Sequence, residues 1–182
     1  MVIGFLQLSL NEDTNMHGFK MDIEKKESLG ELEKSIQSDK LYILDDVCNE
    51  YYYIAIEDDY IIGLACNSCG ADLEYRFADN NDIVYIGIGV HLLCLDINRR
   101  DICFCKTLPS VFIEILSDSS GCYYVIICEL DLYVYKNNNQ LWKIGFRDIV
   151  IDYELIDDKY IKVLTEGEDE TIFSIYNGNV IK

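Results

Sequence analysis

Residues 132–144 read Leu-Tyr-Val-Tyr-Lys-Asn-Asn-Asn-Gln-Leu-Trp-Lys-Ile. Two short runs rich in β-branched and aromatic side chains flank a cluster of asparagines, Asn137–Asn139. Such runs favour strands, and asparagine tolerates the positive φ angles that a tight hairpin turn requires. The segment therefore predicts a β-hairpin. Alternate residues of a hairpin strand must face a core, which predicts that Trp142 is mostly buried.

Similar apolar runs, separated by clusters of Asn, Asp and Gly, extend in both directions from this hairpin. We expect strands at residues 41–44, 51–56, 60–65, 73–77, 83–88, 91–97, 102–105, 111–116, 123–128, 132–135, 141–146, 149–155, 160–164, 171–176 and 179–181. Strands spaced roughly 8–12 residues apart, with short turns between them, are typical of an antiparallel meander. The sequence therefore predicts an all-β fold built from short strands.

The N-terminal part of the chain differs from this pattern. Residues 2–8 form one apolar run, which we expect to be a strand, and residues 9–27 are polar and irregular. One short helix is expected at about residues 28–38, because Ser28 and Glu31 have the spacing of a capping box and apolar residues follow at helical intervals.

The runs also indicate a repeat of 40 residues. Runs at residues 52–55, 92–95, 132–135 and 172–175 lie at this spacing. Four strands per unit would make each unit a propeller blade, whereas chance similarity of short hairpins would leave an open two-layer sandwich. The length fits one domain, 1–182, in which residues 1–40 precede a meander over residues 41–182.

The hairpin within residues 131–146 resembles the inner hairpin of a quinoprotein-type β-propeller blade. In that family a Tyr-Val-Tyr strand, a turn and a Leu-Trp pair recur once in each blade. No other unit of this chain carries the tryptophan, since Trp142 is the only one present. The resemblance implies a propeller-like fold, with fewer units than the roughly four blades of the smallest closed propellers.

The chain is strongly acidic, with 33 acidic and 15 basic residues and a net charge of −18. Such a surface repels phosphate backbones and anionic lipid headgroups, so nucleic acids and membranes are not expected partners. A basic protein is the expected partner, because opposite charge steers association, although solubility alone also explains acidity. The carboxylates expected to form a docking face gather at turns: Glu57, Asp58, Asp59, Asp157, Asp158, Glu166, Glu168, Asp169 and Glu170.

Cysteine usage and the N-terminus bear on the compartment. The short apolar run at residues 2–8 has no basic region before it, and no run approaches the roughly 18 apolar residues of a membrane helix, so we expect a cytoplasmic protein. The eight cysteines lie mostly within apolar runs. We therefore expect reduced thiols that are mostly buried.

Cys66-Asn67-Ser68-Cys69-Gly70 is the sharpest local motif, because a Cys-x-x-Cys turn can aim two thiolates at one zinc ion. Structural zinc takes four ligands, and only Cys103 and Cys105 could complete the set. An ordinary hairpin turn with two cysteines explains the motif equally simply. We therefore expect no metal and no cofactor, with these four cysteines as the only metal candidates.

No pattern for catalysis is present. The chain has two histidines, His17 and His91, and Gly87-Ile88-Gly89 lacks the third glycine and the helix of a dinucleotide site. We expect a non-catalytic, acidic protein-binding module. Its composition is similar to that of bacterial toxin-immunity proteins, which implies neutralisation of a basic toxin such as a nuclease. The alternatives are a propeller-type adaptor that binds an unrelated protein and an enzyme with an unrecognised carboxylate site.

Overall fold

The computed structural model describes residues 20–37, 40–57, 59–78 and 82–181. The strand expected at residues 2–8 and the expected docking residue Asp58 lie outside these described residues. The described chain is all-β, with strands in four sheets and one short helix, α1. None of its helices is long and apolar enough to cross a membrane.

The four sheets follow one another along the chain, and we name them A to D. Sheet A has the order β1 (Met21–Lys25), β3 (Glu50–Ile56), β4 (Tyr60–Cys66), β2 (Leu41–Ile43). Sheet B is β5 (Glu74–Phe77), β6 (Ile83–Ile88), β7 (His91–Asp96), β8 (Asp101–Thr107). Sheet C is β9 (Phe112–Ser117), β10 (Tyr123–Cys128), β11 (Asp131–Lys136), β12 (Asn139–Gly145). Sheet D is β13 (Val150–Ile156), β14 (Tyr160–Thr165), β15 (Glu170–Ser174).

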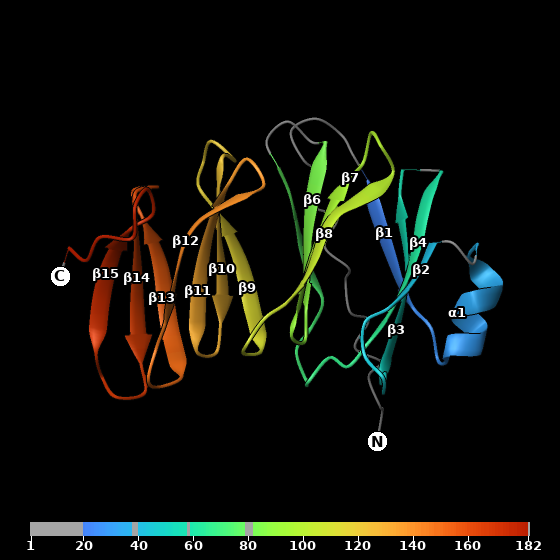
Figure 1. Cartoon of the computed structure of the whole chain (residues 1–182), viewed down its shortest axis with the longest axis horizontal. Coiled ribbons are helices and arrows are strands. Elements are labelled where there is room, and N and C mark those ends of the chain that lie inside the picture. Colours follow the sequence, from blue (N-terminus) through green and yellow to red (C-terminus); the bar gives the residue numbers. More distant parts are fainter. Residues whose placement is uncertain (1–19, 38–39, 58, 79–81, 182) are drawn as a thin grey trace, which may run out of the picture.

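The sheets stand side by side in one row, from α1 beside sheet A to β15 at the opposite end (Figure 1). Three apolar clusters fill the spaces between sheets A and B, B and C, and C and D. The central strands of sheets B and C therefore contribute to a core on both of their faces, which explains why their sequences are continuously apolar. This stack of four-stranded sheets excludes the two-layer sandwich and has the make-up of propeller blades.

The outer face of sheet A is covered by α1 (Leu29–Ser35). Ser28 accepts a hydrogen bond from the backbone N–H of Glu31, as the capping box predicts, and the Glu31 carboxylate accepts one from the N–H of Glu27. Leu32 is fully buried, and Gly63 leaves room on β4 for the side chains of Leu32 and Ile36. The helix thus closes one end of the row.

The interval of 40 residues is visible in the sheets. β7 and β11 are third in their sheets and begin at His91 and Asp131. Each pairs with the next strand through a register shift at the same relative place, between Cys94 and Leu95 in β7 and one interval later in β11. A shared bulge at this interval shows that sheets B and C are built on one plan.

Several expectations need correction. Residues 21–25 form β1, an edge strand within the stretch expected to be irregular. β2 pairs with β4 in parallel, so the meander is not antiparallel throughout. Residues 179–181 form only an isolated bridge, between Val180 and Phe173. Trp142 is half-buried: its ring packs against Gly178 and its Nε1–H donates to the Ile175 carbonyl at 2.9 Å.

Candidate functional site

The structure places the predicted acidic residues in three separate turns. Glu57 and Asp59 lie between β3 and β4, Asp157 and Asp158 between β13 and β14, and Glu166, Glu168, Asp169 and Glu170 between β14 and the start of β15. Sheet A and sheet D lie at opposite ends of the row, and the two turns of sheet D lie at opposite ends of β14 (Figure 1). The three turns are therefore not brought together on one face.

The first of these turns already has partners within the chain. Asp59 forms an ion pair with Arg100, which belongs to the turn between β7 and β8 of sheet B. The Glu57 carboxylate accepts a hydrogen bond from the backbone N–H of Lys20 at 2.9 Å. These contacts tie sheet A to its neighbours, so much of the negative charge of this turn is compensated locally.

The turn at residues 166–169 borders a groove between sheets C and D, which we call the C-terminal groove. It holds about 270 Å³ and is lined by Ile144, Gly145, Phe146, Arg147, Asp148, Val163, Thr165, Asp169, Thr171, Phe173 and Val180. Val163 and Phe173 are almost completely buried and form its floor. The rings of Phe146 and Phe173 meet edge to face with centroids 6.1 Å apart. An aromatic floor with a polar rim is a common form of protein-binding site.

Two carboxylates converge at the rim of the C-terminal groove. A Cβ built on Gly167 would lie 2.9 Å from an oxygen of Asp148 and 3.9 Å from an oxygen of Asp169. Only glycine at this position leaves space for both carboxylates. Like charges held so close repel each other, and a cationic group placed between them would relieve that repulsion.

The four cysteines considered as zinc ligands do not converge. Cys66 is buried in the cluster between sheets A and B, whereas Cys69 is exposed in the following turn, and Cys103 and Cys105 are exposed on the edge strand β8. Burial raises the pKa of the Cys66 thiol to about 12, which keeps it protonated. In the described part of the chain, no group of three or more His, Cys, Asp or Glu side chains could hold a metal ion.

The expectation that the cysteines are mostly buried is wrong. Cys66, Cys94 and Cys128 are buried, Cys48 and Cys122 are half-buried, and the other three are exposed. On β8 the larger apolar residues Ile102 and Phe104 alternate with the cysteines and turn inward. The thiols of this edge strand therefore face solvent.

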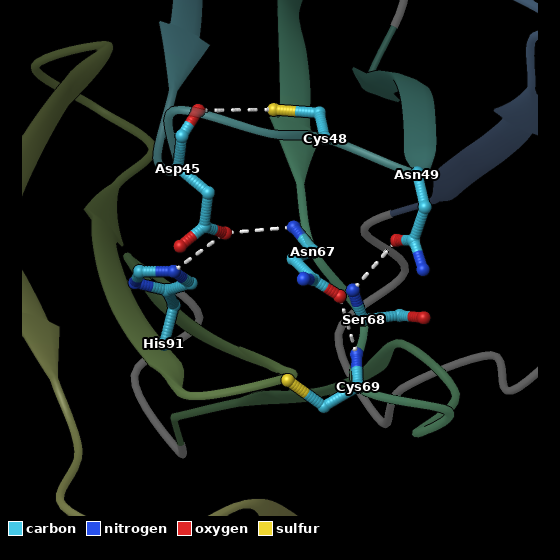
Figure 2. Close-up of polar contacts among 7 residues, drawn as sticks. All are labelled: Asp45, Cys48, Asn49, Asn67, Ser68, Cys69 and His91. Carbon is cyan, nitrogen blue, oxygen red and sulfur yellow. Dashed lines mark hydrogen bonds and ion pairs between the residues drawn. The ribbon is translucent and has the colours of Figure 1, made fainter.

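A buried polar junction joins sheets A and B beside the Cys-x-x-Cys turn. Asp45 accepts the backbone N–H of Asn67 at 2.7 Å and contacts His91 Nε2 at 3.0 Å, and His91 is only 3% exposed. Figure 2 shows Asp45 between these two partners, with the thiols of Cys48 and Cys69 on opposite sides of Asn67. Asp45 thus holds the turn of one sheet against the first residue of β7 in the next.

This junction is well suited to a structural role. His91 is enclosed, Asp45 is engaged by two donors, and Asn49 accepts the backbone N–H of Ser68 at 2.9 Å. Each of these groups orders the turn after β4. We therefore interpret His91 as a packed residue that fixes the position of this turn.

A second polar group was missed by sequence reasoning. Glu74, Arg76, Glu114 and Tyr153 lie on β5, β9 and β13, the first strands of sheets B, C and D. The Tyr153 hydroxyl donates to the Glu114 carboxylate at 2.6 Å. The signal was a charged residue inside an otherwise apolar strand, whereas attention to carboxylates in turns favoured other positions.

Comparisons with solved structures identify the architecture. NirN, a dihydro-heme d1 dehydrogenase solved in complex with DHE, is 13% identical over 73% of this chain and 33% of its own, with a TM-score of 0.50. This neighbour is a β-propeller, and its identity is low enough that the likeness concerns the fold alone. The fold is propeller-like.

Two other structures align less closely. The Cps50 (Swd1) β-propeller domain of Myceliophteria thermophila is 12% identical over 60% of this chain and 36% of its own, with a TM-score of 0.48. Hsv2 of Kluyveromyces lactis is 16% identical over 59% of this chain and 34% of its own, with a TM-score of 0.37. The chain therefore spans about a third of the length of the structures it matches. No protein-family model and no curated protein matches its sequence.

Proposed function

We propose that the chain is a non-catalytic, propeller-like binding module whose C-terminal groove holds a basic and apolar segment of a partner protein. The observation that carries this proposal is the groove itself, in which an aromatic floor meets two converging carboxylates, Asp148 and Asp169. Partner aromatic or aliphatic side chains would pack on Phe146 and Phe173, and a Lys or Arg would reach the rim. A cytoplasmic location and the absence of catalysis are part of the same proposal.

The narrower hypothesis of an immunity protein for a basic toxin has no support from the comparisons. It requires the same chemistry at the groove, because a toxin would have to present a cationic surface to it. The propeller-type adaptor needs only that some partner carries a basic and apolar segment. The likeness to propeller structures agrees better with the adaptor, and identification of the partner would separate the two hypotheses.

The test compares two variants that remove the same charge from different places. Asp148→Asn with Asp169→Asn neutralises the groove rim, whereas Asp157→Asn with Asp158→Asn neutralises the turn at the far end of β14. The probe is a fluorescent peptide that alternates Lys with Phe, and fluorescence anisotropy at about 0.15 M salt measures its affinity, because charges more than about 8 Å away are then largely screened.

We expect the groove variant to lose about tenfold or more in affinity, since it loses charge-assisted contacts, while the control variant changes less than about threefold. Equal losses in both variants would show that only the net charge attracts the probe. A peptide that alternates Glu with Phe should not bind, and binding of that peptide would contradict the role of the rim.

A further inference from the structure

A second groove runs along the first strands of three sheets. It holds about 500 Å³ and is lined by Arg76, Glu114, Leu116, Ser117, Tyr153, Glu154 and Leu155 of β5, β9 and β13. We call it the inner-edge groove. β13 and β15 are the two edge strands of sheet D, so this groove and the C-terminal groove lie on opposite edges of that sheet.

In sheet B, an acid and a base together brace the neighbouring sheet. Glu74 accepts the backbone N–H of Ile115 at 3.4 Å, and Arg76 Nε donates to the Ile115 carbonyl at 3.1 Å. Ile115 lies on β9, an edge strand whose outward backbone groups have no partner strand. The two side chains satisfy these groups and also compensate each other's charge.

Sheet C repeats this arrangement without the base. Glu114 follows Glu74 by the repeat interval of 40 residues, and the strand pairing of both glutamates shifts by the same interval. The position of Arg76 is occupied in sheet C by Leu116, which packs in the core between sheets C and D. The carboxylate is therefore kept at this position of the repeat, whereas its cation is not.

Glu114 has only a neutral partner. The Tyr153 hydroxyl donates to it at 2.6 Å, and within the described chain no Lys, Arg or His pairs with it. The other glutamate on the groove, Glu154, is matched by Lys162 at 2.8 Å. Glu114 is thus the one carboxylate lining this groove that lacks a cation.

The neighbouring groups respond to this unmatched charge. Burial and, next, the negative charge of Glu114 raise the pKa of Glu74 above its ordinary value. Burial and the hydrogen bond to Glu114 raise the pKa of Tyr153, so the tyrosine stays a neutral donor. Both effects indicate a negative potential at the inner-edge groove.

We propose that the inner-edge groove binds a guanidinium group, with Glu114 as its carboxylate anchor. Guanidinium presents parallel donors to a carboxylate, and its weakly hydrated plane tolerates contact with apolar and aromatic walls. Leu116, Leu155 and the ring of Tyr153 supply such walls. This inference stands on its own residues and does not depend on the function proposed for the C-terminal groove.

The test uses matched ligands that differ only in charge. N-acetyl-arginine amide carries the guanidinium, and N-acetyl-citrulline amide is its neutral, nearly isosteric counterpart. Chemical shift changes of the Ile115 and Tyr153 backbone amides report binding in the full chain. A short extended peptide with one central Arg, compared with its citrulline version, distinguishes a guanidinium presented by a protein from one on a free small molecule.

Two variants test the anchor, and a third is the control. Glu114→Gln should weaken guanidinium binding about tenfold, because a charge-assisted contact becomes a neutral one. Leu116→Arg restores the base found in sheet B and should abolish binding by occupying the anchor from within the chain. Glu154→Gln removes an equal charge from the same groove and should change affinity less than about twofold, because Lys162 already compensates Glu154.

The outcomes are decisive in each arm. Binding of the arginine ligand or the arginine peptide, but not of its citrulline counterpart, with loss in both anchor variants supports the proposal. Equal binding of arginine and citrulline, or the same weakening in the Glu154 and Glu114 variants, overturns it. Failure of both arginine probes to shift the Ile115 and Tyr153 amides also overturns it, whatever the C-terminal groove binds.

Discussion

Replacing Gly89 with alanine should destabilise the junction between sheets A and B. Gly89 has a φ of +55°, in the left-handed region, and a Cβ at this position would overlap the backbone carbonyl oxygen of Asn67. The carbonyl carbons of Asn67 and Ser68 lie only 3.2 and 3.3 Å from the same point. Because these are backbone atoms, they cannot rotate away as the tip of a side chain can.

The cost has two parts that a control can separate. A left-handed conformation costs a non-glycine residue about 1–2 kcal/mol, and overpacking costs about 1–3 kcal/mol more. The total of about 2–5 kcal/mol corresponds to a fall of roughly 4–20 °C in Tm for a chain of this length. Gly70 also has a positive φ, +85°, but a Cβ there meets nothing within 4 Å. Gly70→Ala should therefore show only the first part.

Urea unfolding followed by far-UV circular dichroism measures both variants. Gly89→Ala should be less stable than Gly70→Ala by at least about 1 kcal/mol, which is the smallest expected cost of overpacking. Both substitutions reduce the conformational entropy of the unfolded chain similarly, so that effect cancels in the comparison. Equal losses of stability would refute the reasoning that the two sheets are fixed by close backbone approach at this glycine.

Two further predictions concern the polar groups. Asp45→Asn should lower the free energy of unfolding by about 1–3 kcal/mol, because His91 loses a charged partner, whereas Asp46→Asn at an exposed neighbour should change it by less than about 0.5 kcal/mol in the same urea titration. The raised pKa of Glu74 means that the folded state holds this proton more tightly than the unfolded chain does, so the resulting stability is present below the unfolded-state pKa and is lost as pH rises through the folded-state pKa. Glu74→Gln stays neutral and should flatten the dependence of stability on pH, and a profile as steep as that of the wild type would contradict the raised pKa.

The strands were largely predictable because their sequence patterns reflect burial. Runs such as residues 83–88 and 123–128 are apolar throughout, since neighbouring sheets cover both of their faces. β1 escaped prediction because it is an edge strand on which Met21 and Ile23 alternate with charged residues. Such a pattern indicates a strand only when its partner is known, and β3, the partner, lies in a later part of the chain.

The grouping of site residues could not be predicted in the same way. The turns at residues 157–159 and 166–169 are neighbours in sequence, yet the six residues of β14 separate them by about 20 Å at the usual rise of a strand. A list of acidic turns does not say at which end of a strand each one lies. The C-terminal groove also depends on the packing of β12 against sheet D, which is a contact between different repeats.

Both grooves lie at the edges of strands, and the stacking of the sheets explains why. Stacking removes the faces of sheets B and C from solvent, so the surfaces left for recognition are mostly turns and edge strands. Edge strands expose backbone groups that need partners, and this need accounts for charged side chains such as Glu74 and Arg76 within apolar strands. Once a repeat places a carboxylate at each inner edge for this structural reason, loss of one neighbouring base, as at Leu116, is sufficient to leave Glu114 available to a cation from outside the chain.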